Sequence, residues 1–336
     1  MHIDQIPTPA LLVDLPTLRH NIAVMSEALP GSRLRPHVKA FKCTSLAKLL
    51  AEAGHRAFCC ATAKEMVGMA EAGLGDDLLL ANELLDPQRL ATLAGLARAD
   101  RARVTVAVDS PETVEAAAAA GIPEVLVDVD VGLPRCGCRP EDAGRIADLA
   151  RSKGMTVRGV MGYEGHVVGN PDRAWRAAEV EKSMAILTKA HEEVGGDVVS
   201  AGGTGTYDLN RWATEIQAGS YVLMDTEYAK LGLPFRIGLS IWTTVLSVSE
   251  GWAACDAGLK ALGMDHGNPT IEGSTVFFCS DEHTTFIPEG GWRPKPGEKI
   301  RMLPAHIDPT IARHERMWLV EGDEVVDVWP VDLRHW

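Results

Sequence analysis

The sequence predicts an α/β fold in which a closed (β/α)8 TIM-type barrel is followed by an all-β domain. Short apolar runs alternate with helical stretches about eight times over about 220 residues, close to the about 250 residues that such a barrel typically needs. After about residue 235, alternating strand patterns and Pro- and Gly-rich turns replace the helices. A doubly wound open sheet is the alternative for the first part, but units of even length favour closure.

The expected barrel strands are short and continuously apolar, as parallel strands are when helices cover them. They lie at residues 34–38, 57–61, 77–81, 103–108, 124–129, 157–162, 197–200 and 215–218. A helix is expected after Asp14, because Leu18, Ile22, Met25 and Leu29 fall on one face. Further helices are expected at about 44–53, 63–72 and 171–194.

The second domain is expected to contain strands at residues 242–248, 274–279, 299–303, 317–320 and 324–329. Its first strand alternates apolar and polar residues, which is typical of an antiparallel sheet. The apolar run at 10–13 is expected to pair with this sheet. The predicted domains are therefore a barrel at 15–235 and a β-domain made of 1–14 and 236–336.

Composition and charge exclude several classes of protein. Hydrophobic residues make up 46% of the 336 residues, which is enough for a sizeable core. The net charge of −13 argues against nucleic acid or an anionic membrane as a partner, and no apolar run reaches the about 18 residues of a membrane span. The seven cysteines form no CxxC pair and no signal peptide follows Met1, so we expect reduced thiols and a cytoplasmic location.

Lys39 ends the run Arg35-Pro36-His37-Val38-Lys39, directly after the first expected barrel strand. In barrels of this kind the catalytic residues follow the strands. A lysine at such a place can be partly desolvated, which lowers its pKa and frees the amine to attack a carbonyl group. A surface lysine after a strand is the alternative.

Two glycine-rich loops follow the last two expected strands, where phosphate tends to bind in these barrels. Glycine lets backbone N–H groups approach a phosphate, and hydroxyl side chains add donors. The expected phosphate-binding residues are Gly203, Thr204 and Gly205 in the first loop and Gly219, Ser220 and Tyr221 in the second. Two plain glycine turns are the alternative.

Polar side chains also follow the fifth and sixth expected strands. Arg135 follows the fifth, where a guanidinium can hold a phenolate oxygen or a carboxylate, unless it pairs with Asp128 or Asp130. Tyr163 and His166 follow the sixth, and a histidine here can stack on an aromatic ring or act as a base. The lysine, the phosphate loops and the arginine together suit pyridoxal 5′-phosphate (PLP), with the lysine forming an imine and the cofactor acting as electron sink.

These motifs carry a family resemblance over nearly the whole chain. They are Thr8-Pro9-Ala10 with Asp14, Arg35-Pro36-His37-x-Lys39, the Arg135 segment, Tyr163-x-Gly165-His166, Gly202-Gly203-Thr204-Gly205, Asp256-Ala257-Gly258-x-Lys260-Ala261 and Ser280-Asp281-Glu282-His283. The combination resembles the D-threonine aldolase and D-serine dehydratase family, fold-type III PLP enzymes with an alanine-racemase-like barrel and a C-terminal β-domain. The resemblance implies that Lys39 binds the cofactor as an imine and that Arg135 contacts its ring. Ala40-Phe41-Lys42 departs from the family's Thr-His-Lys, which leaves the role of Lys42 open.

A candidate metal pair lies in the second domain, at His306-Ile307-Asp308. On an extended segment, residues i and i+2 point the same way, so His306 and Asp308 can bind one ion, although such a triplet alone is usually chance. The resemblance implies a metal pair here, with His-x-Cys in the dehydratases and His-x-Asp, as in this chain, in the aldolases. An imidazole and a carboxylate suit Mn²⁺, Mg²⁺ or Co²⁺, without excluding Zn²⁺.

The residues and the resemblance favour a PLP- and metal-dependent lyase of the D-threonine aldolase type, which splits a D-3-hydroxy amino acid into glycine and an aldehyde. His166 is the candidate catalytic base beside the catalytic Lys39, and Tyr163, Gln217 and Asp308 can shape the site around it. A D-serine or 3-hydroxyaspartate dehydratase and a non-catalytic PLP carrier are the alternatives, although carriers of that kind have only the barrel. The resemblance also implies a homodimer.

Overall fold

The computed structural model describes residues 1–336, which form two compact units. The barrel unit comprises Met25–Lys39, Leu46–Gly219 and Leu333–Trp336, and the β-unit comprises Met1–Val24, Ala40–Ser45 and Ser220–Asp332. These units are defined by contacts between residues. The domain boundaries expected from the sequence, at residues 14 and 235, stay a prediction. No helix is both long and apolar enough to cross a membrane.

Seven parallel strands form the sheet of the barrel unit, in the order in which they occur along the chain. They are β2 (Ala57–Cys60), β3 (Asp77–Leu80), β4 (Val104–Val108), β5 (Glu124–Asp128), β6 (Thr156–Gly162), β7 (Val198–Ala201) and β8 (Glu215–Ile216). Most of their residues are buried, and most of the buried ones are apolar. The sequence pattern predicted this, because helices cover such a sheet and leave its strands no solvent-facing side.

An extended segment at residues 34–37 bonds to both outer strands of this sheet. Leu34 forms a parallel bridge with Ile216 of β8, and His37 forms one with Cys59 of β2. The predicted first strand is therefore a bridged segment and not a regular strand. Its proline has no N–H group to donate, and a 3-10 helix follows at once. The predicted α/β barrel is confirmed, with seven regular strands and this segment in place of eight.

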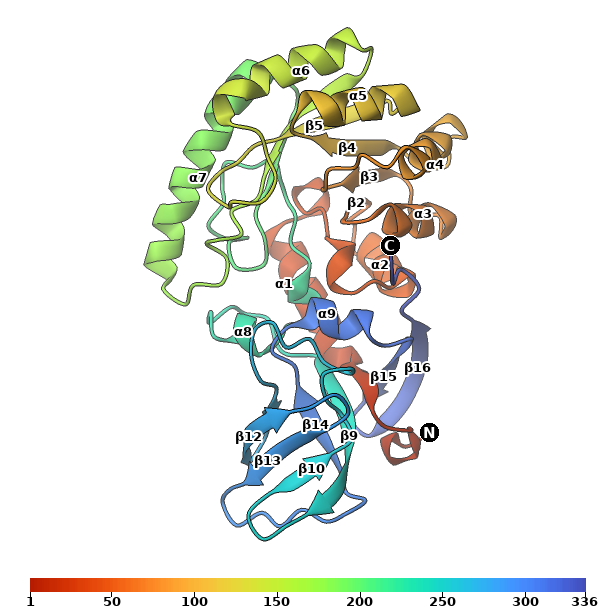
Figure 1. Cartoon of the computed structure of the whole chain (residues 1–336), viewed down its shortest axis with the longest axis vertical. Coiled ribbons are helices and arrows are strands. Elements are labelled where there is room, and N and C mark those ends of the chain that lie inside the picture. Colours follow the sequence, from red (N-terminus) through yellow and green to blue (C-terminus); the bar gives the residue numbers. More distant parts are fainter. The chain divides into compact units, whose positions relative to one another are not determined.

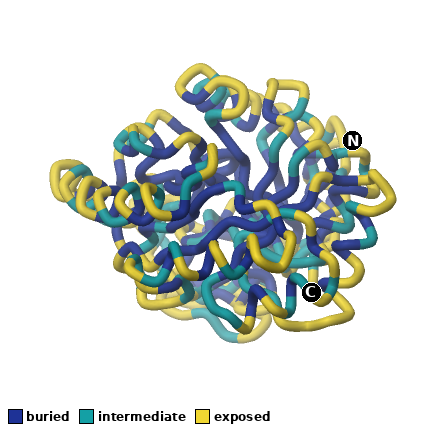
Figure 2. The backbone as a smooth tube through the Cα atoms, turned by 90° about the horizontal axis from the view of Figure 1, so that it is seen from above, coloured by how far each residue is buried: buried dark blue, intermediate teal, exposed yellow.

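Helices cover the outer side of the sheet in this unit, as Figure 1 shows for α3 to α7. The helices before residue 230 are α1 (Leu15–Ala28), α2 (Thr44–Glu52), α3 (Ala63–Glu71), α4 (Pro87–Arg98), α5 (Pro111–Ala120), α6 (Ala143–Ser152), α7 (Arg173–Val194) and α8 (Thr226–Ala229). Helices α4 and α8 were not among those expected, although the Asp86 cap of α4 and its first residue, Pro87, are ordinary start signals. Figure 2 shows buried backbone segments in the interior and exposed segments mainly at the periphery.

A buried ion network lies near the first residues of the barrel strands. Arg35 Nε donates to Glu215 Oε1 at 2.7 Å, and Arg35 Nη2 lies 3.1 Å from Asp77 Oδ2. Arg158 Nη2 lies 2.7 Å from the same oxygen of Asp77. Burial lowers the pKa of Arg35, but Glu215 and Asp77 raise it by more, so the guanidinium is held in its charged form. This end of the barrel interior is therefore filled by paired charges.

Nine strands form the sheet of the β-unit. They are β1 (Ala10–Asp14), β9 (Leu239–Val248), β10 (Ala253–Cys255), β11 (Thr270–Ile271), β12 (Ser274–Cys279), β13 (Thr284–Pro288), β14 (Lys299–Leu303), β15 (Arg316–Glu321) and β16 (Glu324–Pro330). Their order is β12-β13-β10-β9-β1-β15-β16, with β14 paired to β9 and β11. Strand β1 pairs antiparallel with β9 and parallel with β15, which confirms that the N-terminal strand joins this sheet. Strands β10, β11 and β13 were not expected from the sequence.

A short helix, α9 (Ile307–Ala312), replaces the extended segment expected around the candidate metal pair. His306 is its N-cap residue, with φ −145° and ψ 120°, and Asp308 lies in its first turn. Pro309 fits here, because first-turn N–H groups have no partner within a helix. The prediction that His306 and Asp308 lie on an extended segment is therefore wrong. The two residues are close because both lie at the start of a helix.

Candidate active site

Lys39 lies in the 3-10 helix η3 (Val38–Ala40), directly after the bridged segment of the barrel unit, and is half-buried. The thiol of Cys59 on β2 lies within reach of its charge. Burial raises the pKa of Cys59, and the charges of Arg35 and Lys39 act in the opposite direction without outweighing it. The thiol therefore stays protonated, so Cys59 is not a competing nucleophile.

A chain of hydrogen bonds runs from Cys59 into the barrel interior. Cys59 Sγ donates to Gln217 Oε1 at 3.3 Å, and Gln217 Nε2 donates to Ser200 Oγ at 2.8 Å. Ser200 Oγ in turn donates to Glu215 Oε1 at 2.7 Å. These groups are all buried, and each bond satisfies a polar group that would otherwise be costly to bury. Gln217 is thus fixed in one orientation by both of its amide atoms.

Three expected cofactor residues contact one another in the barrel unit. The guanidinium carbon of Arg135 lies 5.6 Å from the centre of the Tyr163 ring, within range of a cation–π interaction. The same ring packs against Gly203, where an added Cβ would lie 3.3 Å from Tyr163 Cε2. Arg135 and Tyr163 also line a small hollow together with Asp128. Burial and Glu83 raise the pKa of Asp128 well above its ordinary value despite the charge of Arg135, which makes this carboxyl a poor ion-pair partner.

His166 lies on the surface of the barrel unit, in the turn after β6. Its ring packs on the backbone of Gly132, where an added Cβ would lie 2.8 Å from His166 Cε1. Gly132 has φ +122°, a conformation that glycine adopts without strain. Because Gly132 and Arg135 belong to one loop, the imidazole lies beside the loop that carries the arginine.

Glu164 organises the first glycine-rich loop and is fully buried. Its carboxylate accepts hydrogen bonds from Gly202 N at 3.0 Å, Thr206 Oγ1 at 3.0 Å and Asn210 Nδ2 at 3.3 Å. Burial raises its pKa, and these bonds lower the pKa by less. The role of Glu164 was not expected from the sequence, where the available signal is an acidic residue directly after a buried strand.

The N–H groups of this loop are partly used by the loop itself. The N–H of Gly202 donates to Glu164, and the N–H of Gly203 donates to Thr206 Oγ1 at 3.1 Å. Gly205 is required for packing, because an added Cβ would lie 1.9 Å from the carbonyl oxygen of Val168. Hydrogen bonding within the loop and close packing therefore explain the presence of these glycines without a ligand. The phosphate-binding role of Gly203, Thr204 and Gly205 stays a prediction.

The second glycine-rich loop divides between the two units. Gly219 is buried at the end of a segment of the barrel unit, and Ser220 and Tyr221 begin the 3-10 helix η5 (Ser220–Val222) of the β-unit. The ring of Tyr221 is buried and lies 5.5 Å from that of Phe235. Ser220 Oγ donates to Asp308 Oδ1 at 3.5 Å. The hydroxyl of Ser220 thus lies beside the expected metal pair.

His306 and Asp308 lie close enough to share an ion. His306 Nε2 is 3.9 Å from Asp308 Oδ1, and both side chains are largely buried, with exposed fractions of 19% and 15%. An ion bonded at about 2.1 Å to each of two atoms can bridge up to about 4.2 Å between them. One imidazole nitrogen and one carboxylate oxygen therefore fit a divalent cation in both chemistry and spacing.

Asp225 anchors the start of α9 and is fully buried. Its Oδ2 accepts from Ile307 N at 3.1 Å, and its Oδ1 accepts from Tyr228 N at 2.8 Å as the N-cap of α8. Burial raises the pKa of Asp225 to about 6, and the charge of Asp308 adds to this effect. Asp225 thus ties α8 to the residues that present the candidate metal ligands.

Two further residues of the β-unit adjoin His306, and neither was expected from the sequence. Asp265 Oδ2 lies 2.7 Å from His306 Nδ1, and the ring of His266 stacks on that of His306 with 4.0 Å between centroids. The signal in the sequence is only an Asp-His-Gly turn, which is common at protein surfaces. The contact joins two segments far apart in the sequence, so no local pattern indicates it.

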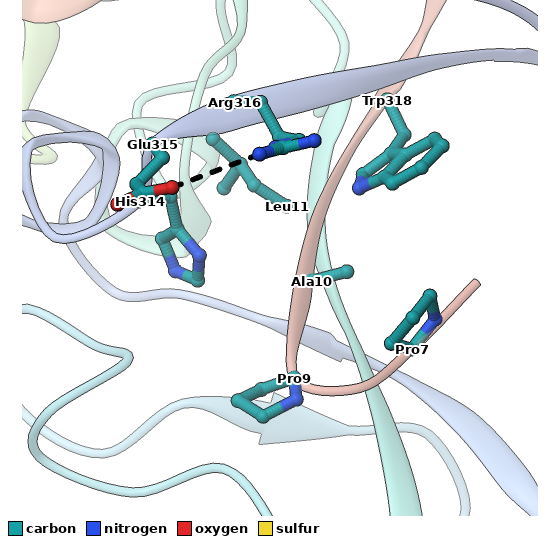
Figure 3. A pocket seen from close by; sticks show the side chains of 8 residues that line it. All are labelled: Pro7, Pro9, Ala10, Leu11, His314, Glu315, Arg316 and Trp318. Carbon is teal, nitrogen blue, oxygen red and sulfur yellow. Dashed lines mark ion pairs between the residues drawn. The ribbon is translucent and has the colours of Figure 1, made fainter.

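A separate pocket of about 300 Å³ lies in the β-unit, near the first residues of β1 and β15 (Figure 3). It is lined by Pro7 and Pro9 on one side and by His314, Glu315, Arg316 and Trp318 on the other. Glu315 Oε2 and Arg316 Nη2 lie 3.7 Å apart and form a mutual ion pair. None of the expected site residues lines this pocket, so it is not part of the candidate active site.

Comparison with known protein families identifies both parts of the chain. Residues 13–227 match the alanine racemase N-terminal domain, and residues 238–320 match the putative serine dehydratase domain. The chain belongs to the alanine racemase N-terminal domain family. This confirms the resemblance expected from the sequence and the alanine-racemase-like barrel.

The relatives that match nearly the whole chain at 27–31% identity include aldolases and a dehydratase, which are lyases. D-threonine aldolase of Arthrobacter sp. is 31% identical over 98% of this chain and 93% of its own length. The crystal structure of D-threonine aldolase from Filomicrobium marinum has a TM-score of 0.92 and 31% identity, covering 98% of this chain and 96% of that chain. D-threo-3-hydroxyaspartate dehydratase of Delftia sp. HT23 is 27% identical over 96% of both chains. The protein is accordingly an enzyme of the lyase class.

Proposed function

We propose that this enzyme is a PLP- and divalent-metal-dependent lyase of the D-threonine aldolase type, which cleaves D-3-hydroxy amino acids to glycine and an aldehyde. The observation that carries the proposal is the His306–Asp308 pair, with 3.9 Å between an imidazole nitrogen and a carboxylate oxygen. Such donors suit Mn²⁺, Mg²⁺, Co²⁺ or Zn²⁺. The aldolases among the similar proteins support the same reaction.

The proposal assigns PLP to the barrel unit. Lys39 supplies the amine that binds the cofactor covalently, and Arg135, Tyr163 and His166 contact its ring. The contact between Arg135 and Tyr163 supports this assignment, because it presents a cation and an aromatic face together. The phosphate is assigned to Gly203, Thr204, Gly205, Gly219, Ser220 and Tyr221. When bound, PLP withdraws the electron pair left at Cα after bond cleavage.

In the proposed reaction His166 acts as the general base. Its imidazole takes the proton from the β-hydroxyl oxygen of the substrate, the Cα–Cβ bond breaks, and the aldehyde leaves. The electron pair of that bond passes to Cα, which then accepts a proton to give glycine. A divalent ion on His306 and Asp308 lowers the pKa of a hydroxyl group that binds it.

A product assay tests the proposal. The protein is supplied with PLP and, in turn, with Mn²⁺, Mg²⁺, Co²⁺ or Zn²⁺, and is given D-threonine, D-threo-3-hydroxyaspartate or L-threonine as control. We expect glycine and an aldehyde from a D-substrate, none from L-threonine, and loss of activity with retention of PLP after treatment with EDTA. Activity that survives exhaustive chelation would rule out a catalytic ion at His306 and Asp308.

A dehydratase is the second candidate function. The match of residues 238–320 to the putative serine dehydratase domain favours it, as does the similarity to the Delftia dehydratase. A dehydratase releases ammonia and a 2-oxo acid instead of glycine, so the same assay separates the two. PLP binding without any product from D-amino acids would indicate a non-catalytic carrier.

The proposed enzyme acts on small molecules as a homodimer in the cytoplasm. Both properties come from the family resemblance and the cysteine pattern. Light scattering of the purified protein measures the oligomeric state, and a monomer at the concentrations used in the assay would contradict the proposed homodimer.

A further inference from the structure

The imidazole of His306 lies between two carboxylates of the β-unit. Its Nδ1 lies 2.7 Å from Asp265 Oδ2, and its Nε2 lies 3.9 Å from Asp308 Oδ1. An ionised carboxylate accepts hydrogen bonds and cannot donate them, so the nitrogen at 2.7 Å carries the hydrogen. The other nitrogen then presents its lone pair on the side of Asp308.

We propose that Asp265 is a positioning residue that fixes the tautomer and direction of the metal ligand His306, and that His266 fixes the plane of its ring. This inference rests on the proposed function, because it concerns how the chain presents one of the two proposed ligands. A carboxylate bonded to the far nitrogen of a histidine ligand orients the ring and makes the other nitrogen a stronger donor.

Because the ring of His266 stacks on that of His306, His266 is not a second histidine ligand of the same ion. Nitrogen atoms of both histidines and an oxygen of Asp265 lie within 4.8 Å of one another, a spacing that by itself would suit an ion. The two rings, however, are inclined by only 4° and their centroids lie 4.0 Å apart. Lone pairs of imidazole nitrogens lie in the ring plane, so parallel stacked rings direct them into separate planes. They do not converge on one ion, and His266 instead limits the rotation of the His306 ring.

Further hydrogen bonds hold Asp265 against α9, and we call the whole set the α9 ladder. It consists of the contacts Ala261–His314, Gly263–Thr310 and Asp265–His306. Gly263 N donates to Thr310 Oγ1 at 3.0 Å, and His314 Nε2 lies 2.9 Å from the carbonyl oxygen of Ala261. The partners His306, Thr310 and His314 recur every four residues, from the N-cap of α9 to two residues past its end, and the partners of the other segment recur every two. The position of the Asp265 carboxylate is therefore set by three contacts and not by one.

A close backbone approach lies in the middle of the α9 ladder. An added Cβ on Gly263 would lie 2.3 Å from Pro309 Cγ, so only glycine allows the segment to approach α9 this closely. Thr310 Oγ1, which accepts from Gly263, also donates to the carbonyl oxygen of His306 at 2.6 Å. The backbone at His306 and the turn that carries Asp265 are thus fixed through one hydroxyl group.

Exposure sets the size of the expected effect. The side chain of Asp265 is 54% exposed, so solvent weakens its bond to His306, whereas His306 is only 19% exposed. Loss of a partner that orients a metal ligand typically costs 10–100-fold in metal affinity. For a half-exposed partner we expect the lower end of that range, about tenfold.

Two measurements on the full-length protein test the proposal, and neither depends on activity. The first is the tautomer of His306 in the metal-free protein, from long-range ¹H–¹⁵N spectra of histidine-labelled protein. The second is the dissociation constant of Mn²⁺ alone, from the electron paramagnetic resonance of the free ion. The variants are Asp265→Ala, Asp265→Asn, His266→Ala, His266→Phe, His306→Ala and Asp308→Ala, with the exposed Asp281→Asn as a control of equal charge change.

We expect Asp265→Ala to lose the Nδ1–H tautomer of His306 and to weaken Mn²⁺ binding about tenfold. Asp265→Asn keeps an acceptor oxygen and should retain the tautomer with a smaller loss of affinity. His266→Phe keeps a flat ring and should bind Mn²⁺ more tightly than His266→Ala. His306→Ala and Asp308→Ala should abolish binding, and Asp281→Asn should leave both readouts unchanged.

Three other outcomes would each contradict a different part of the argument. An Asp265→Ala protein that matches Asp281→Asn in both readouts would overturn the positioning role and leave the metal pair intact. Loss of binding in Asp265→Ala and His266→Ala, with none in Asp308→Ala, would place the ion on Asp265, His266 and His306 and overturn the inference. Unchanged binding in both His306→Ala and Asp308→Ala would instead contradict the metal pair of the proposed function.

Discussion

The buried carboxylate of Glu164 accepts a hydrogen bond from the backbone N–H of Gly202 at 3.0 Å, and so joins the turn after β6 to the loop after β7. Thr206 and Asn210 donate to the same carboxylate from further along that loop. The loop is therefore held in one conformation by its own contacts. A loop that is ordered in advance lowers the entropy cost of binding a ligand.

Replacement of this carboxylate should loosen the loop. Glu164→Gln places an NH₂ group against a donor, so it should lower the free energy of unfolding by about 1–3 kcal/mol. It should also weaken PLP binding about tenfold, equivalent to about 1.4 kcal/mol. Urea unfolding and fluorescence titration with PLP measure the two effects. Glu181→Gln, at an exposed position on α7, is the matched control, and equal PLP affinity in the two variants would show that the loop does not depend on Glu164.

The same carboxyl group should make stability depend on pH. Burial raises the pKa of Glu164 above its ordinary value of 4.5. The folded protein then holds the proton more tightly than the unfolded chain, so the stabilisation is complete below pH 4.5 and is lost as the pH rises through the folded pKa. The difference in unfolding free energy between the wild type and Glu164→Gln should therefore shrink as the pH rises above 4.5 and through the raised pKa of the folded protein. Urea unfolding at a series of pH values checks this, and a difference that grows with pH contradicts the raised pKa.

Covalent attachment of PLP should occur at Lys39. Reduction of the PLP-loaded protein with borohydride, followed by peptide mass spectrometry, should find the label there. Lys39→Ala should lose both the label and all turnover, while Lys42→Ala should keep the label. Lys42 has φ 46°, and this left-handed conformation gives its backbone a different course from that of Lys39. Label on Lys42 in the wild type would contradict the assignment.

The choice of Asp at position 308 should determine metal preference. Asp308→Cys replaces a carboxylate with a thiolate, which favours zinc, so we expect zinc to bind about tenfold more tightly. Cleavage of the Cα–Cβ bond should fall, because the longer zinc–sulfur bond moves the ion. Bound metal is measured by mass spectrometry beside glycine and ammonia release from D-threonine, with Asp281→Cys as an exposed control. Unchanged metal content and product ratio would show that Asp308 is not a ligand.

The ion network in the barrel should be far more important for stability than an exposed pair. Arg35→Ala leaves the buried Glu215 without its cation, while Asp77 keeps its bond to Arg158, and should cost about 3–5 kcal/mol of unfolding free energy. Arg56→Ala breaks the exposed pair with Asp76, at 3.2 Å, and should cost about 0–1 kcal/mol. Urea unfolding of the two variants measures the difference. Equal losses would indicate that solvent reaches the network.

The sequence indicated those parts of the fold that depend on local patterns. Continuous apolar runs predicted β2 to β8, because burial on both faces removes polar positions from a strand. The same reasoning predicted a regular first strand at 34–38, and there a proline and a following 3-10 helix leave only isolated bridges. Helix α9 was missed because the His-x-Asp triplet was interpreted as part of an extended segment, although the proline that follows it also fits a first helical turn.

For the candidate site, too, the sequence indicated the residues that a local pattern marks and missed those defined only by contacts in the folded chain. Arg135, Tyr163 and Gly203 were each selected for their place after a strand, and the structure brings them into contact because parallel strands end at one edge. Glu164 and Asp265 were not selected. Their partners, such as Asn210 and His306, lie far away in the sequence, and no spacing rule connects two residues that meet only after folding.

Strand β1 has a consequence for how the chain is made. It leaves the ribosome before every other strand, yet its neighbours are β9 and β15, and β15 is synthesised near the opposite end of the chain. During translation β1 therefore exposes two unsatisfied edges while the parallel strands between it and β9 are completed. Unpaired edges of an apolar strand attract other chains. Until β15 is made, the edge of β1 that it covers in the folded protein has no partner from this chain, so the sheet cannot be completed before the last part of the sequence is synthesised.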